Sequence, residues 1–168
     1  MNNGTQTLSV KSLLGRISDD TLRLIDVRRE EEYSIGHITN AVNLPLAKLL
    51  DDDKPENVAK LAGELGISDN TSVAIYDDTF GALSSRVAWT LQYIGHQDVS
   101  LLEVTYSQWK DLGYDISTDI PSINTVKHSI NLQPDILATA DYLEKAKEKK
   151  NVVLIDNRER LNFLEHHI

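Results

Sequence analysis

Short apolar segments alternate with amphipathic segments along the chain. Leu22–Val27 and Ser72–Tyr76 are short, apolar and bounded by polar or charged residues, a pattern that predicts buried strands. Weaker patterns of the same kind predict strands at residues 41–44 and 99–102. Helical spacing or single helical turns are indicated over residues 7–17, 29–33, 46–50, 55–65, 84–94 and 107–112. Strands that alternate with helices are typical of β-α-β units, so we expect an α/β fold whose central parallel sheet is flanked by helices.

The pattern changes after this region. Residues 117–131 are mostly polar, contain Pro121 and show few regular features. We therefore predict a linker over residues 117–133. A helix is then predicted from Pro134 to Lys150 and a strand over Val152–Asp156, which together indicate that a second domain begins here.

The predicted second domain repeats the sequence of the first. Leu24–Arg28 returns as Leu154–Arg158 with four identical residues, and His37 returns as His167, all at one offset of 130 residues. This spacing is too long for a solenoid repeat and indicates a duplicated domain. We expect one whole domain over residues 7–116, a linker over 117–133 and a truncated start of a second domain over 134–168.

Composition and charge narrow the function further. The 168 residues are 40% hydrophobic and 26% charged, with a formal net charge of −9, as in ordinary soluble domains. Such an acidic chain is unlike proteins that bind nucleic acids or anionic membrane surfaces, so we expect neither partner. The N-terminus shows no secretory signal pattern, and no apolar run approaches the roughly 20 residues of a membrane helix. We predict a cytoplasmic protein.

The chain has no cysteine. This excludes disulfides, thiolate metal sites and a cysteine nucleophile within these 168 residues. The adjacent carboxylates of Asp77 and Asp78 are a weak signal for a cation site, so we predict no metal and no cofactor.

Several motifs resemble one known family. Asp26-Val27-Arg28, Glu32-Tyr33 and the segment from Gly36-His37-Ile38 to Pro45 are similar to the opening signature of rhodanese-like domains. The later features that resemble the family are Tyr76 before a loop, Arg86 and Trp89 in the next helix, Gly95-His96, Leu101 and Trp109. With the duplication, the chain is most similar to tandem-domain thiosulfate or 3-mercaptopyruvate sulfurtransferases. The resemblance implies a three-layer fold and, in such proteins, an inactive first domain followed by a second domain that carries the cysteine.

The resemblance also locates the reactive loop. Family members transfer sulfane sulfur through a cysteine persulfide, formed where a strand ends in a tight loop before a helix. Asp77 stands at the position of that cysteine, and aspartate cannot form a persulfide. The carboxylates of Asp77 and Asp78 also oppose the binding of an anion by like charge, and we expect them to cap the following turn. The degenerate loop comprises Asp77, Asp78, Thr79, Phe80 and Gly81, with Arg86 nearby.

The other signature residues are interpreted as structural. We expect Asp26 and Arg28 to pair at a strand end, and Gly36-His37 to form a turn in which the histidine is hydrogen-bonded. Trp89 and Trp109 are expected in the core or at a domain interface. Arg86 is expected to form a salt bridge with Asp77 or Asp78. A further departure from the family is Glu103-Val104-Thr105, where a pair of glycines is usual.

Two functions follow from these residues. The first is the non-catalytic rhodanese-like half of a tandem-domain sulfurtransferase, with the missing C-terminal domain as its intramolecular partner. The alternative is a stand-alone, cysteine-free rhodanese-like binding or regulatory module. In either case the truncated second domain has an apolar helix face and a strand without a sheet to complete, so we expect it to be mobile, to self-associate or to dock on the first domain.

Overall fold

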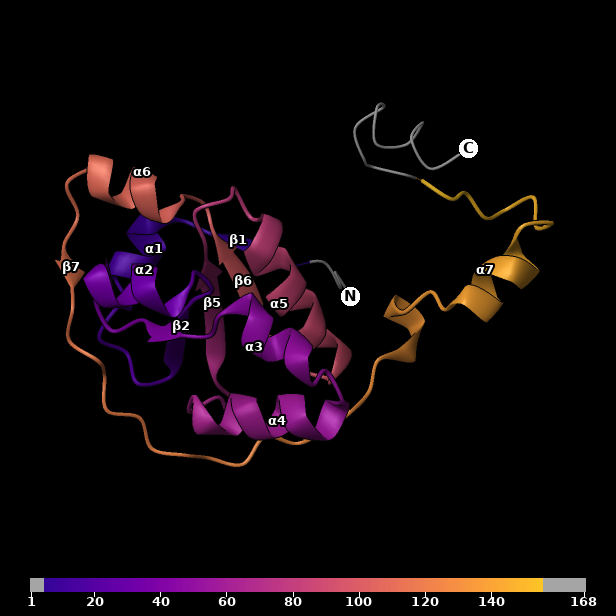
Figure 1. The fold of residues 1–168 in the computed structure, drawn as a ribbon, viewed down its shortest axis with the longest axis horizontal. Helices are drawn as coiled ribbons and strands as arrows, with labels where there is room; N and C mark the ends of the chain where they lie inside the picture. Colours follow the sequence, from indigo (N-terminus) through magenta and orange to yellow (C-terminus); the bar gives the residue numbers. More distant parts are fainter. Residues whose placement is uncertain (1–4, 156–168) are drawn as a thin grey trace. The chain divides into compact units, whose positions relative to one another are not determined.

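The computed structural model describes residues 5–155 and divides the chain into two units, residues 1–134 and 135–168. The first unit contains a five-stranded sheet with the order β1-β6-β5-β2-β4 (Figure 1). Its strands are β1 (Gln6–Leu8), β2 (Leu22–Asp26), β4 (Val42–Asn43), β5 (Ser72–Tyr76) and β6 (Val99–Leu102). All of the pairings within this sheet are parallel, as the sequence predicts.

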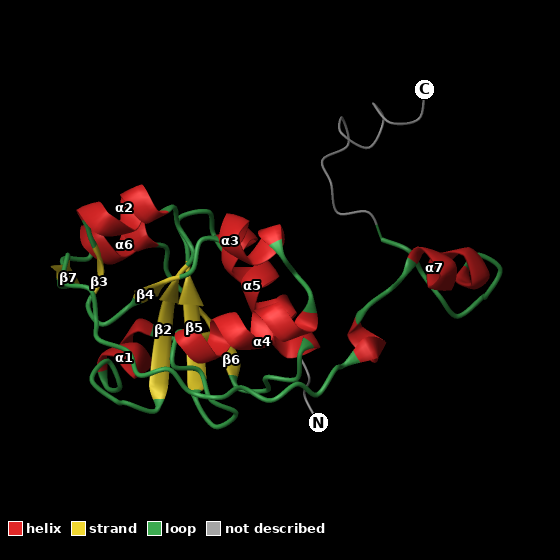
Figure 2. Cartoon of the chain, turned by 60° about the horizontal axis from the view of Figure 1, so that its bottom comes forward, coloured by secondary structure: helices red, strands yellow, loops and turns green. Residues whose placement is uncertain are grey.

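Helices cover both faces of the sheet (Figure 2). One face carries α1 (Val10–Leu14), α2 (Glu30–Ile35) and α6 (Tyr106–Asp111). The opposite face carries α3 (Leu46–Asp51), α4 (Pro55–Glu64) and α5 (Ala82–Tyr93). The prediction of a central parallel sheet flanked by helices is confirmed.

The two faces arise from the alternation of side chains along the central strands. In β2, Leu24 packs with α1, α2 and α6, whereas its neighbour Ile25 packs with α3, α4 and α5. Ala74 and Ile75 divide in the same way in β5. Because successive side chains of a strand point to opposite faces, an uninterrupted apolar run is what a sheet covered on both sides requires. These four residues are almost fully buried.

The N-terminal prediction of one helix over residues 7–17 is wrong at its start. Residues 6–8 form β1, which pairs with β6 at the edge of the sheet. The Ser9 hydroxyl then accepts a hydrogen bond from the N–H of Ser12 and begins α1, which ends at Leu14. The cap and the pairing with β6 thus divide the amphipathic segment into a strand and a short helix.

Two further strands lie outside the main sheet. The antiparallel pair of β3 (His37–Ile38) and β7 (Ile116–Ser117) joins His37 to Ser117 and Ile38 to Ile116. The predicted linker therefore begins inside a strand pair. The chain that follows, residues 118–133, has no regular secondary structure and is called the strap below.

The strap is packed along the first unit by backbone hydrogen bonds. Four strap N–H groups donate to this unit: Val126 to the Gly63 carbonyl, Ser129 to the Asp69 carboxylate, Asn131 to the Ile94 carbonyl and Gln133 to the Tyr93 carbonyl, at 2.8–3.0 Å. Glycines allow this close approach, because a Cβ at Gly63 would collide with the Val126 carbonyl and one at Gly95 would lie 2.5 Å from the Asn131 carbonyl oxygen. The segment predicted as a linker is thus a packed part of the first unit.

The second unit differs from the prediction of one long helix over residues 134–150. A 3-10 turn, η1 (Pro134–Ile136), precedes a shorter helix, α7 (Ala140–Ala146), whose first turn is capped by the Thr139 hydroxyl. The predicted strand is not formed at residues 152–155, where no partner strand lies beside it, and its last residue, Asp156, lies outside the described residues. The repeat of Arg28 and His37 at Arg158 and His167 also lies outside them, so the second copy stays a prediction.

No helix in residues 5–155 combines the length and the apolar character needed to cross a lipid bilayer.

Packing of the strap gives a first test. Gly63→Ala places a methyl group against the backbone of Val126, whereas Gly15→Ala places one at ordinary van der Waals distance, 3.6 Å, from its neighbours. Both changes remove a flexible glycine from helical backbone, so their difference reports the collision. We expect Gly63→Ala to unfold with about 1–3 kcal/mol less free energy than Gly15→Ala in urea titrations. Equal free energies of unfolding would contradict the strap packing.

Candidate functional site

Two buried carboxylates lie at the carboxyl ends of β2 and β5. The parallel register places Asp26, the last residue of β2, opposite Tyr76, the last residue of β5. Asp77 follows Tyr76 directly in the chain. Each carboxylate is the centre of its own set of hydrogen bonds.

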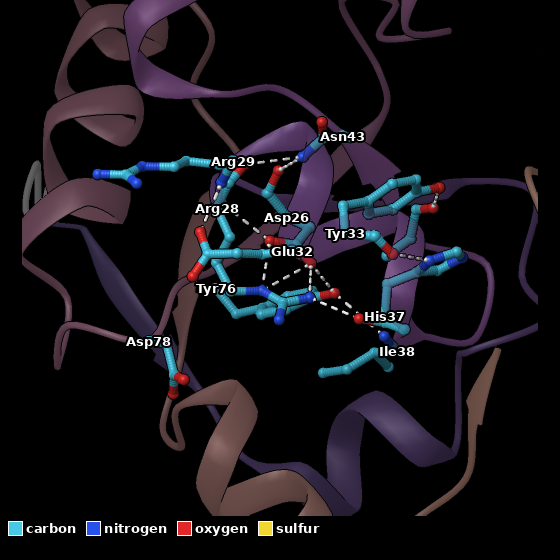
Figure 3. A network of polar contacts seen from close by, with 12 residues as sticks. Asp26, Arg28, Arg29, Glu32, Tyr33, His37, Ile38, Asn43, Tyr76 and Asp78 are labelled. Carbon is cyan, nitrogen blue, oxygen red and sulfur yellow. Dashed lines mark hydrogen bonds and ion pairs between the residues drawn. The ribbon is translucent and has the colours of Figure 1, made fainter. Parts of the chain in front are cut away.

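The Asp26 carboxylate is fully buried and binds Arg28 (Figure 3). It accepts bonds from the guanidinium, with Nε at 3.0 and 3.1 Å from the two oxygens, and from the Arg28 backbone N–H at 2.9 Å. The Tyr76 hydroxyl donates to the same carboxylate at 2.7 Å. Arg28 Nη2 also donates to the Gly36 carbonyl at 2.8 Å. The two charges therefore form the pair at the strand end that the sequence predicts.

Aromatic rings enclose this ion pair. The Arg28 guanidinium lies 3.5 Å from the centre of the Tyr106 ring, a cation–π contact. Burial and the nearby charge of Asp26 raise the pKa of Tyr76 well above its ordinary value, so its hydroxyl remains a donor. Burial would lower the pKa of Arg28, but the hydrogen bonds and the charge of Asp26 raise it above its ordinary value. The pair is charged and its groups are engaged within the fold.

His37 is fully buried beside this network. Its ring stacks on Tyr33, with centroids 3.8 Å apart, and its Nδ1 lies 3.0 Å from the Tyr33 carbonyl oxygen. Its Nε2 lies 3.1 Å from the carbonyl oxygen of Asp119. The preceding Gly36 packs so closely that a Cβ there would lie 2.8 Å from the Tyr106 hydroxyl. Both ring nitrogens of His37 are therefore held by backbone.

The Asp77 side chain is 2% exposed and fills the loop that follows β5. Oδ1 accepts from the backbone N–H groups of Thr79 and Gly81, and Oδ2 accepts from those of Leu83 and Ser84, each at 3.0 Å. The hydroxyls of Thr79 and Ser84 also donate to Oδ2, at 2.9 and 3.1 Å. Six donors thus surround one carboxylate.

The loop folds around Asp77 because its backbone turns through the left-handed region. Phe80 has φ = 55° and Gly81 has φ = 91°, and α5 begins directly afterwards. The first N–H groups of a helix have no partner within the helix, and Asp77 supplies one for Leu83 and Ser84. The expectation that this aspartate caps the following turn agrees with these bonds.

The donors also set the charge of Asp77. Burial would raise the pKa of this carboxyl, but the backbone N–H groups of Ser84, Gly81 and Thr79 and the Thr79 hydroxyl lower it below its ordinary value. The loop therefore holds a carboxylate anion of its own. It offers no thiol, and the donors that could bind an external anion are already used.

Asp78 and Arg86 contact different parts of the fold. The Asp78 carboxylate accepts from the Ser107 hydroxyl and N–H, at 2.6 and 2.9 Å, and so joins the loop to α6. Arg86 lies 4.8 Å from the centre of the Trp89 ring. The expected salt bridge of Arg86 with Asp77 or Asp78 is not among the ion pairs of residues 5–155. It was wrong because backbone donors, and not a cation, compensate Asp77.

The two tryptophans lie in different environments. Trp109 is fully buried, and its indole N–H donates to the Asp115 carbonyl at 2.9 Å. Trp89 is half-buried on α5, where its ring stacks on Tyr93 with centroids 5.4 Å apart. Trp109 is therefore a core residue, which is one of the two places, core or domain interface, that were expected for it.

A hollow of about 540 Å³ is lined by residues that follow β2 and by residues of the loop after β5. Its wall includes Arg28, Arg29, Glu32, Asp78 and Thr79, so both signs of charge line it. In Figure 3 the Arg29 side chain points away from the Asp26 network. No group of three or more histidine, aspartate or glutamate side chains within residues 5–155 is placed to hold a metal ion.

Sequence reasoning missed the hydroxyl partners of the loop. Ser84 and Ser107 lie 7 and 29 residues from the aspartates they bind. An aspartate directly after a strand and before a glycine-containing turn was a usable signal for the cap. No comparable signal identifies Ser107, since its contact depends on how α6 packs.

The Asp77 carboxylate gives a second prediction. Asp77→Asn replaces an oxygen acceptor by an NH₂ group that faces N–H donors, so we expect a loss of about 2–3 kcal/mol in the free energy of unfolding near pH 7. The exposed Asp53→Asn is the control, with a change under about 0.5 kcal/mol. A pKa lowered in the folded state adds stability above the unfolded value, 3.8, and that stability declines as the pH falls below it. The difference between wild type and Asp77→Asn should therefore shrink below pH 4, and a constant difference would contradict this account.

The Asp26–Arg28 ion pair gives a third prediction. Asp26→Asn leaves the buried Arg28 cation without its counter-ion, and we expect a loss of about 3–5 kcal/mol in guanidinium unfolding. The exposed pair of Glu144 and Lys147 is the control, and Glu144→Gln should cost less than about 1 kcal/mol. Arg28→Met added to Asp26→Asn should recover part of the loss, because the unpaired charge is removed. A double variant less stable than Asp26→Asn would argue against charge pairing.

Comparisons with known proteins agree with this geometry. The 3-mercaptopyruvate sulfurtransferase of Mus musculus is 29% identical over 143 residues, covering 79% of this chain and 48% of the mouse protein. The sulfur carrier protein TtuD of Thermus thermophilus is 26% identical over 154 residues, covering 84% of this chain and 54% of TtuD. The chain spans about half the length of these curated relatives.

A solved structure shows the same fold. The crystal structure of SseA from Escherichia coli, described by its "Rhodanese" fold and as a 3-mercaptopyruvate sulfotransferase, superposes with a TM-score of 0.84 at 21% identity. The superposition covers 95% of this chain and 68% of SseA. A family model of the rhodanese-like domain matches residues 9–112, a range that includes α1 to α6 and the Asp77 loop. The chain belongs to the rhodanese-like domain family.

Proposed function

We propose that the first unit, predicted from the sequence as residues 7–116 and extended by the strap to residue 133, forms the non-catalytic half of a tandem-domain sulfurtransferase. The complete protein would transfer sulfane sulfur from thiosulfate or 3-mercaptopyruvate to a thiophilic acceptor through a cysteine persulfide on its other half. One observation carries the proposal: the position directly after β5 holds Asp77, whose carboxylate is bound by six donors of its loop and of the first turn of α5.

The chemistry of the loop supports a non-catalytic role. Persulfide formation requires a thiolate that attacks the sulfane sulfur, and in the 168-residue chain no residue is a cysteine. A carboxylate with its lone pairs directed at six donors is a poor nucleophile and leaves no donor for a thiosulfate anion. The loop therefore stabilises the fold and takes no part in sulfur transfer.

The lengths and names of the relatives support the tandem arrangement. The mouse protein and the Bos taurus thiosulfate sulfurtransferase are each covered over 48% of their length by this chain. A second domain of similar size is the proposed intramolecular partner, for which the first domain acts as a scaffold. Val153, Leu154 and Ile155 of the second unit are 76–79% exposed. A completed second domain would bury them, and the isolated chain would bury them by self-association.

The test compares the 168-residue chain with the product of the gene read beyond codon 168. We expect the longer protein to form thiocyanate from cyanide and thiosulfate, or pyruvate from 3-mercaptopyruvate, and to lose this activity when the cysteine of its second half becomes alanine. The 168-residue chain should form neither product and take up no ³⁵S from labelled thiosulfate.

Two results would overturn the proposal. One is turnover by the 168-residue chain itself, since that activity would need a nucleophile other than cysteine. The other is a gene that ends after codon 168. That result would favour the stand-alone binding module, and the search would move to its partners by affinity capture.

A further inference from the structure

Two histidines join the strap to the body of the first unit. His96 follows α5 and is 2% exposed, and His128 lies on the strap and is 8% exposed. Nδ1 of His96 lies 3.1 Å from Nε2 of His128, and Nε2 of His96 lies 2.9 Å from the carbonyl oxygen of Thr71. The two residues are called the latch below. They take no part in the Asp26 or Asp77 centres.

The contacts assign the protons of the latch. A carbonyl oxygen only accepts, so Nε2 of His96 carries a proton and donates to Thr71. Nδ1 of His96 is then the acceptor, and Nε2 of His128 donates to it. Nδ1 of His128 is buried and has no hydrogen-bond partner within residues 5–155. This arrangement satisfies both contacts with two neutral rings.

An additional proton finds no suitable place in the closed latch. On Nδ1 of His128 it creates a buried N–H without an acceptor. On Nδ1 of His96 it faces the N–H of His128 and forces that ring into its other tautomer, which again leaves an N–H at Nδ1 without an acceptor. Protons on both rings would place two cations 3.1 Å apart at the contact. In each case the charged latch is less stable than the neutral one.

We propose that the His96–His128 latch is an acid-sensitive device that holds the strap on the first unit and releases it as the pH falls below neutrality. Release separates His128 from His96 and exposes both rings to water. There they take up protons without the constraints of the closed contact.

Two neighbouring carboxylates oppose the loss of the strap at low pH, because they stabilise protonated histidine rings. Asp69, in the turn before β5, and Asp98, at the start of β6, face the latch and favour positive rings. One carboxylate oxygen of each is engaged elsewhere, however, with Asp69 Oδ1 accepting from the Ser129 N–H and Asp98 Oδ2 from the Ser72 hydroxyl. Burial, and then the neighbouring His128, lower the pKa of His96 below its ordinary value. A lowered pKa adds stability to the closed strap above about pH 6.5, and this stability is lost as the pH falls below that value.

Release frees the end of the strap from the rest of the first unit. The strap ends at Gln133, next to the boundary between the units at Pro134. In the closed strap, Asn131 and Gln133 are held at the end of α5 by their bonds to the Ile94 and Tyr93 carbonyls. An open strap of this length is a flexible chain with a root-mean-square span of about 20–24 Å. The inference is independent of the proposed function, because it concerns the strap and not sulfur transfer.

Hydrogen exchange of the 168-residue chain between pH 5 and 8 tests the latch. The readout is the protection of the strap amides of Val126, Asn131 and Gln133, corrected for the intrinsic exchange rate at each pH. Each proton taken up on release steepens the opening equilibrium by up to tenfold per pH unit. We expect strap opening to increase about tenfold between pH 6.5 and 5.5, while the amides of β2 and β5 keep their protection.

Variants separate the latch from other acid effects. His128→Gln keeps an amide donor for His96 but cannot titrate, so strap opening should depend less steeply on pH, because only the buried His96 remains to take up a proton. Lys127→Gln, a change at the neighbouring exposed position, should keep the dependence of the wild type. Gly63→Ala should open the strap at every pH. A wild-type strap whose protection does not change with pH, or an unchanged dependence in His128→Gln, would overturn the proposal.

A measurement on the wild type covers the case in which His128→Gln fails to fold. Nitrogen-detected NMR of the imidazole rings should show His96 neutral at pH 7 with its proton on Nε2. A His96 ring that carries two protons at pH 7 would also overturn the proposal. Neither experiment reads sulfur transfer, so failure of the latch and failure of the proposed function are distinguishable.

Discussion

The parallel register of β2 against β5 is the constraint on which the rest of the site depends. It places Asp26 opposite Tyr76, so that the tyrosine hydroxyl reaches the Asp26 carboxylate on the face covered by α2 and α6. The next residue, Asp77, then starts the loop that leads to α5 on the other face. Because alternate side chains of a strand point in opposite directions, one register separates two buried carboxylates that are close in space.

These two carboxylates are stabilised in different ways. Asp26 is compensated by a cation, Arg28, which is itself enclosed by aromatic rings and bound to the Gly36 carbonyl. Asp77 is compensated by neutral donors, chiefly the N–H groups of its loop and of the first turn of α5. A buried ion pair loses much of its stabilisation when one partner is removed, whereas a set of dipoles is fixed by the backbone. This explains why the loop needs no contact with Arg86.

Much of this arrangement could be predicted from the sequence. The alternation of apolar segments gave the sheet and the helices on its two faces, and the position of Asp77 followed from the motif around Tyr76. The features that escaped prediction depend on contacts between distant residues. Three residues become β1 only because β6 offers a free edge, and Val126 fits against Gly63 only because a helical glycine lacks a Cβ. A local sequence pattern does not show which distant residues will make contact. The helix predicted from Pro134 was also too long, because the pattern alone did not show where the helix begins and ends.

The Asp77 loop is stabilised because an internal carboxylate fills its hydrogen-bond donors. The left-handed residues Phe80 and Gly81 turn the backbone so that its N–H groups face this carboxylate. With Asp77 present they are saturated, so the loop gains hydrogen bonds and loses the capacity to bind an external anion. The charge that stabilises this loop therefore also occupies the donors that would hold a second anion.

The strap changes where the first domain ends. A boundary at residue 116, as the polar sequence suggested, would divide β7 and remove its pairing with β3. It would also uncover the surfaces of Gly63 and Gly95 that receive backbone carbonyls, and it would leave His96 without His128. β3, the two glycines and His96 are all contacted by residues that follow residue 116. The division between the two units therefore lies at Pro134, after the strap.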